Sequence, residues 1–124
     1  MGYYNSARVE VFDFVPSGAQ KILEIGCGEG AFRKNFGDIE YWGVEPNVAA
    51  ASVAVKSLTH VIVGGFEDVK HKLPNAYFDL IVCNDVIEHM TDHDSFFLAI
   101  RDKLSVDGNI IGSVPNVRFV DNFI

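Results

Sequence analysis

Short apolar runs alternate with amphipathic segments along this chain. Five runs rich in β-branched and aromatic residues predict strands at 21–25, 41–45, 60–63, 77–84 and 109–115. Helices or helical turns are predicted between them at 30–37, 47–58, 66–73 and 92–104, with Asn47 as the N-cap of the second. The run at 77–84 is almost unbroken, which is typical of a central strand covered on both faces. The alternation therefore predicts βαβ units and a parallel sheet.

These elements predict an α/β fold. We expect a doubly wound, mostly parallel sheet in the order 3-2-1-4-5, with helices on both faces and a turn over 106–108 before the fifth strand. Residues 1–124 are expected to form a single domain, with a core over 20–116 and a leading helix or lid within 1–19. Ligands of such sheets bind at the carboxyl ends of the strands, at the switch point between the first and fourth strands.

Composition narrows the classes of function. The net charge of −7 and the lack of a Lys/Arg cluster make nucleic acid an unlikely partner. No apolar run approaches the roughly 20 residues that span a bilayer, and the first residues lack a secretory signal pattern, so no membrane partner is expected. Cys27 and Cys83 form neither a disulfide framework nor a zinc set. They are predicted to be buried thiols, and the protein is expected to be cytoplasmic.

Three glycines follow the first strand in quick succession. Gly26, Gly28 and Gly30 allow a backbone with positive φ and a close approach by a ligand. The segment after them can present free N–H groups to a polar ligand. Together with Ala31 the glycines also satisfy the dinucleotide fingerprint G-x-G-x-x-A. Glu45, at the end of the second strand, can accept hydrogen bonds from both hydroxyls of a ribose. These features fit NAD and S-adenosyl-L-methionine equally well.

Four segments in order resemble the class I (Rossmann-like) S-adenosylmethionine-dependent methyltransferases. They are "LEIGCGEG", "YWGVEP", "FDLIVCNDVIEHM" and "LSVDGNIIGSVPN", and the resemblance extends over about residues 20 to 116. It implies that the cofactor is S-adenosyl-L-methionine. Glu24 agrees with this choice, because a carboxylate at that strand end suits a cationic amino-acid tail and would repel a pyrophosphate.

The resemblance also implies which residues contact the cofactor. They are Glu24, Gly26, Cys27, Gly28, Glu45, Pro46, Gly65, Phe66, Glu67, Asn84, Asp85, Val86 and His89. Glu24 is expected at the methionine end, and Glu45 at the ribose. The family usually has an acid at the position of Gly65, where this chain has none. Phe66 is therefore the expected adenine contact. Which acidic residue, if any, accepts a hydrogen bond from the adenine amine is left open. No catalytic residue is identified.

The segment "DVIEH" at 85–89 leaves three interpretations open. Asp85, Glu88 and His89 share one face if the segment is helical, and two carboxylates with an imidazole suit Mg²⁺ or Mn²⁺. The segment resembles the metal-binding E-x-x-E-H of small-RNA 2′-O-methyltransferases and of quinone-biosynthesis O-methyltransferases. Metal-free relatives also carry "EH" here, so the segment can instead shape the cofactor site, or His89 can act as a general base. We assign no metal ligand.

The resemblance implies methyl transfer to a small-molecule or sugar-like acceptor. The alternatives are a metal-dependent O-methyltransferase of the RNA or quinone-precursor type, an NAD-dependent oxidoreductase, and a non-catalytic cofactor-binding domain. Members of the family add two strands after the fifth, whereas this chain ends at Ile124. We therefore expect the last two strands to be missing, the chain to be too short for activity alone, and a homodimer to form through an open strand-five edge over 109–124.

Overall fold

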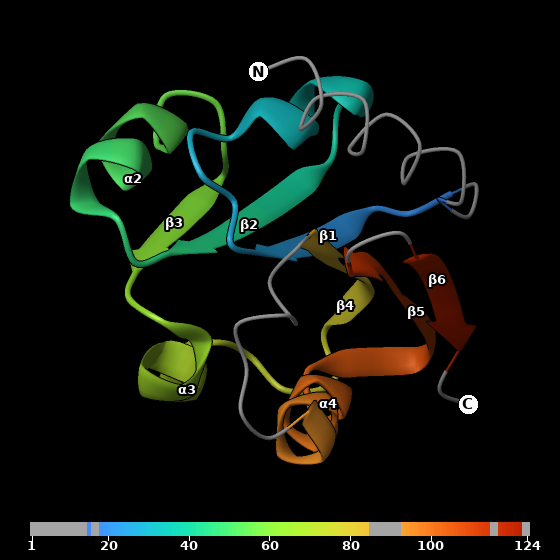
Figure 1. The fold of residues 1–124 in the computed structure, drawn as a ribbon. Helices are drawn as coiled ribbons and strands as arrows, with labels where there is room; N and C mark the ends of the chain where they lie inside the picture. Colours follow the sequence, from blue (N-terminus) through green and yellow to red (C-terminus); the bar gives the residue numbers. More distant parts are fainter. Residues whose placement is uncertain (1–14, 16–17, 85–92, 115–116, 123–124) are drawn as a thin grey trace.

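The computed structural model describes residue 15 and residues 18–84, 93–114 and 117–122 (Figure 1). The predicted leading helix at 6–15 and the segment 85–92 lie almost entirely outside the described residues. No helix within the described ranges is long and apolar enough to cross a membrane.

One six-stranded sheet forms the centre of the molecule. The strands are β1 (Lys21–Ile25), β2 (Glu40–Glu45), β3 (His60–Val63), β4 (Phe78–Asn84), β5 (Leu104–Val114) and β6 (Val117–Asn122). Their order is β3-β2-β1-β4-β5-β6, and the first five are parallel to their neighbours. The predicted order 3-2-1-4-5 is confirmed.

The predicted open edge at strand five is wrong. β6 pairs with β5 in antiparallel register from Asn109–Asn122 to Val114–Val117. The backbone of β5 is therefore hydrogen-bonded on both sides, and one strand beyond the fifth is present. The outermost strand of the described sheet is therefore β6 and not β5, and a dimer through residues 109–124 stays a prediction.

The turn predicted over 106–108 lies inside β5. Leu104 pairs with Phe78 and Asn109 pairs with Leu80. Between these two pairs β5 advances five residues, whereas β4 advances only two. Asp107 takes up the extra length with a φ of 64°, a left-handed conformation that Asp tolerates better than most residues. The sequence did indicate an irregular backbone at 106–108, but β5 pairs with β4 both before and after this point.

Helices cover both faces of the sheet, as predicted (Figure 1). The 3₁₀ helix η1 (Ala31–Asn35) and helix α2 (Val48–Ala54) lie on one face. Helices α3 (Phe66–Val69), which continues into the 3₁₀ helix η2 (Lys70–Lys72), and α4 (His93–Arg101) lie on the other. All are shorter than the sequence pattern indicated.

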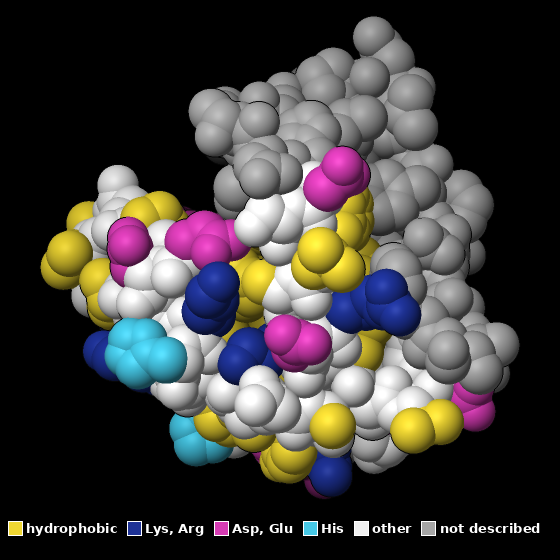
Figure 2. Space-filling model, turned by 90° about the horizontal axis from the view of Figure 1, so that it is seen from below, with side chains coloured by type: hydrophobic (Ala, Val, Ile, Leu, Met, Phe, Trp, Pro, Cys, Tyr) yellow, Lys and Arg dark blue, Asp and Glu magenta, His cyan; other side chains and the backbone are white. Residues whose placement is uncertain are grey.

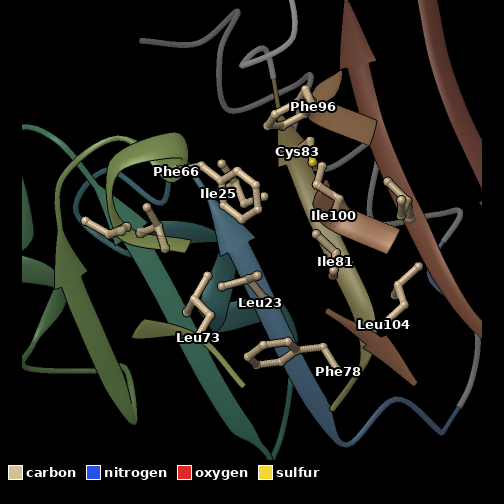
Figure 3. Packing of buried hydrophobic residues seen from close by; sticks show 13 residues of the cluster. Leu23, Ile25, Phe66, Leu73, Phe78, Ile81, Cys83, Phe96, Ile100 and Leu104 are labelled. Carbon is tan, nitrogen blue, oxygen red and sulfur yellow. The ribbon is translucent and has the colours of Figure 1, made fainter. Parts of the chain in front are cut away.

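The two faces of the sheet carry separate cores, because successive strand residues point to opposite sides. On one face, Phe66 of α3 and Phe96 of α4 pack with Ile25 and Ile81 (Figure 3). On the other, Tyr41 belongs to a cluster with Ile22, Phe32, Ala54, Leu58, Leu80 and Ile111. Hydrophobic burial on both faces explains why the apolar runs predicted the strands well.

Both cysteines are free and buried, as predicted. Burial raises the pKa of the Cys83 thiol far above its usual range, and the nearby Glu24 carboxylate raises this pKa further. Cys83 is therefore an unreactive thiol of the core, since the thiolate is the reactive form.

The face covered by α3 and α4 shows acidic and basic side chains side by side (Figure 2). Its Lys and Arg side chains are interspersed with Asp and Glu, and hydrophobic side chains show between them. Such a mixed surface on the described residues of this face is unlike the basic stripe of phosphate-backbone binders.

Asn47 caps α2, as predicted, since its Oδ1 accepts a hydrogen bond of 2.9 Å from Ala50 N. Asn47→Ala is expected to lower the free energy of unfolding by about 1 kcal/mol, because that amide loses its partner. Chemical denaturation measures the change. Asn47→Ser, which keeps a side-chain acceptor, should recover most of it. An alanine variant as stable as the wild type would show that the cap contributes nothing.

Candidate cofactor-binding site

The carboxyl ends of β1 and β2 meet at one edge of the sheet. The chain leaves β1 at Ile25 and turns at once, and the amides of Gly26 and Cys27 both donate to Val44 O of β2, at 2.8 and 3.2 Å. Because β1 and β2 are parallel neighbours, this brings the glycine-rich turn (residues 26–30) beside Glu45. These two strand ends form part of the carboxyl edge of the sheet, and the predicted switch point lies between β1 and its other neighbour, β4.

The glycine-rich turn needs its glycines. Gly26, Gly28 and Gly30 have φ values of 78°, 57° and 91°, which side-chain-bearing residues rarely adopt. Gly30 N donates to Cys27 O at 2.9 Å and closes the turn. A Cβ on Gly30 would lie 2.8 Å from Leu58 Cδ1 and 3.1 Å from Ser57 Oγ. The positive φ values that the three glycines allow are therefore present, and Cys27 faces the core within the turn.

Glu45 links the two strand ends. Its Oε1 accepts a hydrogen bond of 2.8 Å from Gly28 N, and its Oε2 accepts one of 2.9 Å from Asn47 N. A carboxylate offers about four lone-pair positions, so each oxygen retains capacity for a second donor. The side chain is partly exposed and stands beside the exposed Pro46. Glu45 is thus fixed in position and still able to accept from a ribose.

Glu24 lies deeper in the same edge. It is completely buried, and its Oε1 accepts a hydrogen bond of 2.7 Å from the Tyr41 hydroxyl. Tyr41 is a residue of the site that the sequence reasoning missed. The sequence feature that could have identified it is the alternation of side chains along 41–45. Once the pairing of β1 with β2 is known, this alternation places Tyr41 and Gly43 on the same face of the sheet as Glu24.

The turn after β3 carries the residues predicted for the adenine. Gly65 precedes α3, and its carbonyl accepts hydrogen bonds from Asp68 N and Val69 N. The Phe66 ring is 3% exposed and packs edge-on against Phe96, with centroids 5.6 Å apart. The ring is thus part of the core packing between α3 and α4, and its role at the adenine stays a prediction. Glu67 is exposed and pairs with Lys70 at 2.9 Å.

The end of β4 reaches the same edge of the sheet. Asn84 is its last residue and pairs with Ser113 of β5. Asp85, Val86 and His89 lie outside the described residues, as does Glu88. The part of the chain that the structure describes holds no group of three or more His, Cys, Asp or Glu side chains that could bind a metal ion. The three interpretations of 85–89 therefore stay predictions.

The described part of the edge fits S-adenosylmethionine in two respects. A turn with three glycines at positive φ lets a nucleoside approach the backbone, and Glu45 keeps acceptor capacity for its diol. The Glu24 carboxyl group also lies near the end of β1, beside the turn where a dinucleotide would place its pyrophosphate. Like charges there disfavour a pyrophosphate and favour a ligand with a cationic tail.

Fold and site together define a class I, Rossmann-like S-adenosylmethionine-dependent methyltransferase domain. The chain belongs to the methyltransferase domain family, whose sequence model matches residues 4–122. The resemblance noted in the sequence is thereby confirmed, and S-adenosylmethionine is the cofactor of this class. Membership in this family does not support the alternative of an NAD-dependent oxidoreductase.

Two relatives of known function share part of this sequence. The mitochondrial ubiquinone biosynthesis O-methyltransferase of Schizosaccharomyces pombe is 29% identical over an alignment length of 101, and the match covers 74% of this chain and 36% of that protein. The ubiquinone biosynthesis O-methyltransferase of Rhodopseudomonas palustris is 31% identical over an alignment length of 81, and the match covers 61% of this chain and 32% of that protein. The chain thus spans about a third of the length of these relatives.

Solved structures show the same fold. A S-adenosylmethionine-dependent methyltransferase from Thermotoga maritima superposes with a TM-score of 0.71 at 26% identity, over 89% of this chain and 50% of that one. Another from Archaeoglobus fulgidus gives a TM-score of 0.74 at 24% identity, over 91% and 53%. The chain covers about half of each structure.

Proposed function

We propose that this chain binds S-adenosylmethionine and supplies the cofactor half of a methyltransferase that acts on a small-molecule acceptor. The observation that carries the proposal is the position of Glu45, hydrogen-bonded to the glycine-rich turn through one oxygen and to the start of α2 through the other. This arrangement holds an acceptor for the ribose diol next to backbone that a nucleoside can approach. The family membership and the fold support it.

The chemistry asks for alignment more than for ionisable groups. A nucleophilic atom of the acceptor forms a bond to the methyl carbon while the bond from that carbon to sulfur breaks. The sulfur keeps the electron pair and becomes the thioether of S-adenosylhomocysteine, and the acceptor loses a proton to a base. Holding the two reactants in line can supply much of the acceleration. Such chemistry requires no catalytic triad.

A quinone precursor is a second candidate for the acceptor, with oxygen as the methylated atom. The two relatives are ubiquinone biosynthesis O-methyltransferases. The sequence "DVIEH" at 85–89 adds support, since it resembles the metal-binding segment of quinone-biosynthesis O-methyltransferases. This candidate predicts that methylation of a catechol-type substrate depends on Mg²⁺ or Mn²⁺. Equal turnover in the presence of a chelator would instead favour the metal-free site.

Calorimetry with S-adenosylhomocysteine tests the proposal directly. Binding in the micromolar range is expected, with no heat from NAD at the same concentration. Absence of binding at millimolar S-adenosylhomocysteine would contradict the proposal, and preferential binding of NAD would restore the oxidoreductase alternative. Binding without any transfer to a panel of small acceptors would favour a non-catalytic cofactor-binding domain.

A further inference from the structure

Tyr41 and Glu24 form a buried pair beneath the glycine-rich turn. Both side chains have no exposed surface, and the tyrosine hydroxyl donates to Glu24 Oε1 at 2.7 Å. A carboxyl group taken out of water needs hydrogen-bond donors, because leaving it unpaired costs several kcal/mol. The tyrosine hydroxyl provides one such donor to an oxygen that water cannot reach.

The register of β1 and β2 explains how the two side chains meet. Ile22 lies opposite Tyr41, and Glu24 lies opposite Gly43, so Tyr41 and Glu24 are diagonal neighbours on one face of the sheet. Gly43 carries no side chain that could separate them.

The ring of Tyr41 is also held from the side. Phe36 packs against it with centroids 5.7 Å apart, and the Arg33 guanidinium lies 5.9 Å from its centroid. The hydroxyl is therefore aimed at Glu24 by a packed ring and does not sample other directions freely.

We propose that Tyr41 is a positioning residue for cofactor binding, whose hydroxyl holds the Glu24 carboxylate in place for the cationic amino-acid end of S-adenosylmethionine. The inference deepens the proposed function and rests on it. Tyr41 itself touches no ligand in this scheme; it acts through Glu24. Without the hydroxyl, the carboxyl group would keep its burial but lose a donor that favours both its orientation and its ionised form.

Other charged or titratable groups stand around the pair. Among the described residues they are Cys83 on β4, which interacts electrostatically with Glu24, Arg33 on η1, which reaches the Tyr41 ring, and Cys27 and Glu45 at the carboxyl ends of β1 and β2. The Cys83 thiol stays neutral near pH 7, because burial raises its pKa. Between pH 5 and 8, a change in binding that depends on Tyr41 therefore reports on the Glu24 carboxyl group.

The test is the affinity of Tyr41→Phe for S-adenosylhomocysteine, measured by calorimetry from pH 5 to 8. We expect roughly tenfold weaker binding at pH 7, since a hydrogen bond to a charged group is lost. The fall in affinity on acidification should also begin at a higher pH than in the wild type, because the ionised carboxylate is less favoured. A purely structural tyrosine would lower the melting temperature and leave this pH profile where it was.

Tyr77→Phe is the matched control. The Tyr77 hydroxyl donates to Glu40 Oε2 at 2.6 Å, which is the same chemistry between the same residue types. Glu40 begins β2 and Tyr77 directly precedes β4, so this pair lies at the opposite ends of the strands from the glycine-rich turn. Tyr77→Phe should lose stability but keep the wild-type affinity and pH profile.

A double-mutant cycle keeps the inference testable if Tyr41→Phe is poorly stable. In a Glu24→Gln background, which has no carboxylate to position, Tyr41→Phe should change the affinity by less than twofold. Equal losses with and without the Glu24 carboxylate would overturn the inference. So would a wild-type affinity and pH profile in folded Tyr41→Phe. A wild-type protein that binds no S-adenosylhomocysteine would overturn the proposed function together with it.

Discussion

Glu45→Ala is expected to weaken the binding of S-adenosylhomocysteine by about 100-fold. Two ribose hydroxyls would lose a charged acceptor, and each hydrogen bond to a charged group contributes about 1.5–3 kcal/mol. The lower end of that range, about 3 kcal/mol for the pair, corresponds to about two factors of ten. The substitution also deprives Gly28 N and Asn47 N of their acceptor, so the glycine-rich turn loses a contact that holds its shape. Calorimetry at constant pH and salt measures the affinity.

Glu29→Gln is the control for Glu45→Ala. Glu29 is an exposed carboxylate within the glycine-rich turn, so its replacement removes one negative charge from nearly the same place. We expect its affinity to stay within twofold of the wild type. The affinity of Glu45→Gln should lie between those of Glu45→Ala and Glu29→Gln, because the amide keeps one oxygen acceptor and loses the charge. If Glu45→Ala binds as tightly as Glu29→Gln, the ligand does not use Glu45.

The parallel core of the sheet could be predicted from sequence because burial and local pattern agree there. The run at 77–84 is apolar enough to need cover on both faces, and it became the central strand β4. The glycine-rich turn was equally readable, since each of its glycines marks a backbone conformation that other residues avoid. Glu45 was singled out by its place at the end of the second strand, without any knowledge of its contacts.

The missed features depend on pairings that a single sequence does not reveal. β6 is a short strand whose only local signal is the apolar and aromatic content of residues 117–120, and it is stabilised by pairing with β5. The hydrogen bond between Tyr41 and Glu24 needs both the register of two strands and one side-chain rotamer. The packing of Phe66 against Phe96 likewise depends on tertiary contacts, while the adenine contact that the family resemblance implies for Phe66 stays a prediction.

Gly43→Ala is expected to destabilise the protein although the change is a single methyl group. A Cβ on Gly43 would lie 2.5 Å from Leu58 Cδ2, 2.6 Å from Cys27 Sγ and 3.0 Å from Cys27 Cβ. These distances are well inside van der Waals contact, and such overpacking typically costs about 1–3 kcal/mol. Because Cys27 belongs to the glycine-rich turn, the clash also pushes on the backbone that a cofactor would approach. Affinity for S-adenosylhomocysteine should therefore fall together with the free energy of unfolding.

Gly37→Ala separates this clash from the general effect of replacing a glycine. A Cβ at Gly37 would meet nothing within 4 Å, and its φ lies outside the left-handed region. Chemical denaturation should show Gly37→Ala within about 0.5 kcal/mol of the wild type. In a Cys27→Ala background the sulfur contact is gone, so Gly43→Ala should lower the free energy of unfolding by less than it does in the wild type. Such coupling is expected of residues in contact. If the losses of unfolding free energy from Gly43→Ala and Cys27→Ala simply add in the double variant, the strain at Gly43 is relieved elsewhere. β2 and the glycine-rich turn would then not constrain each other.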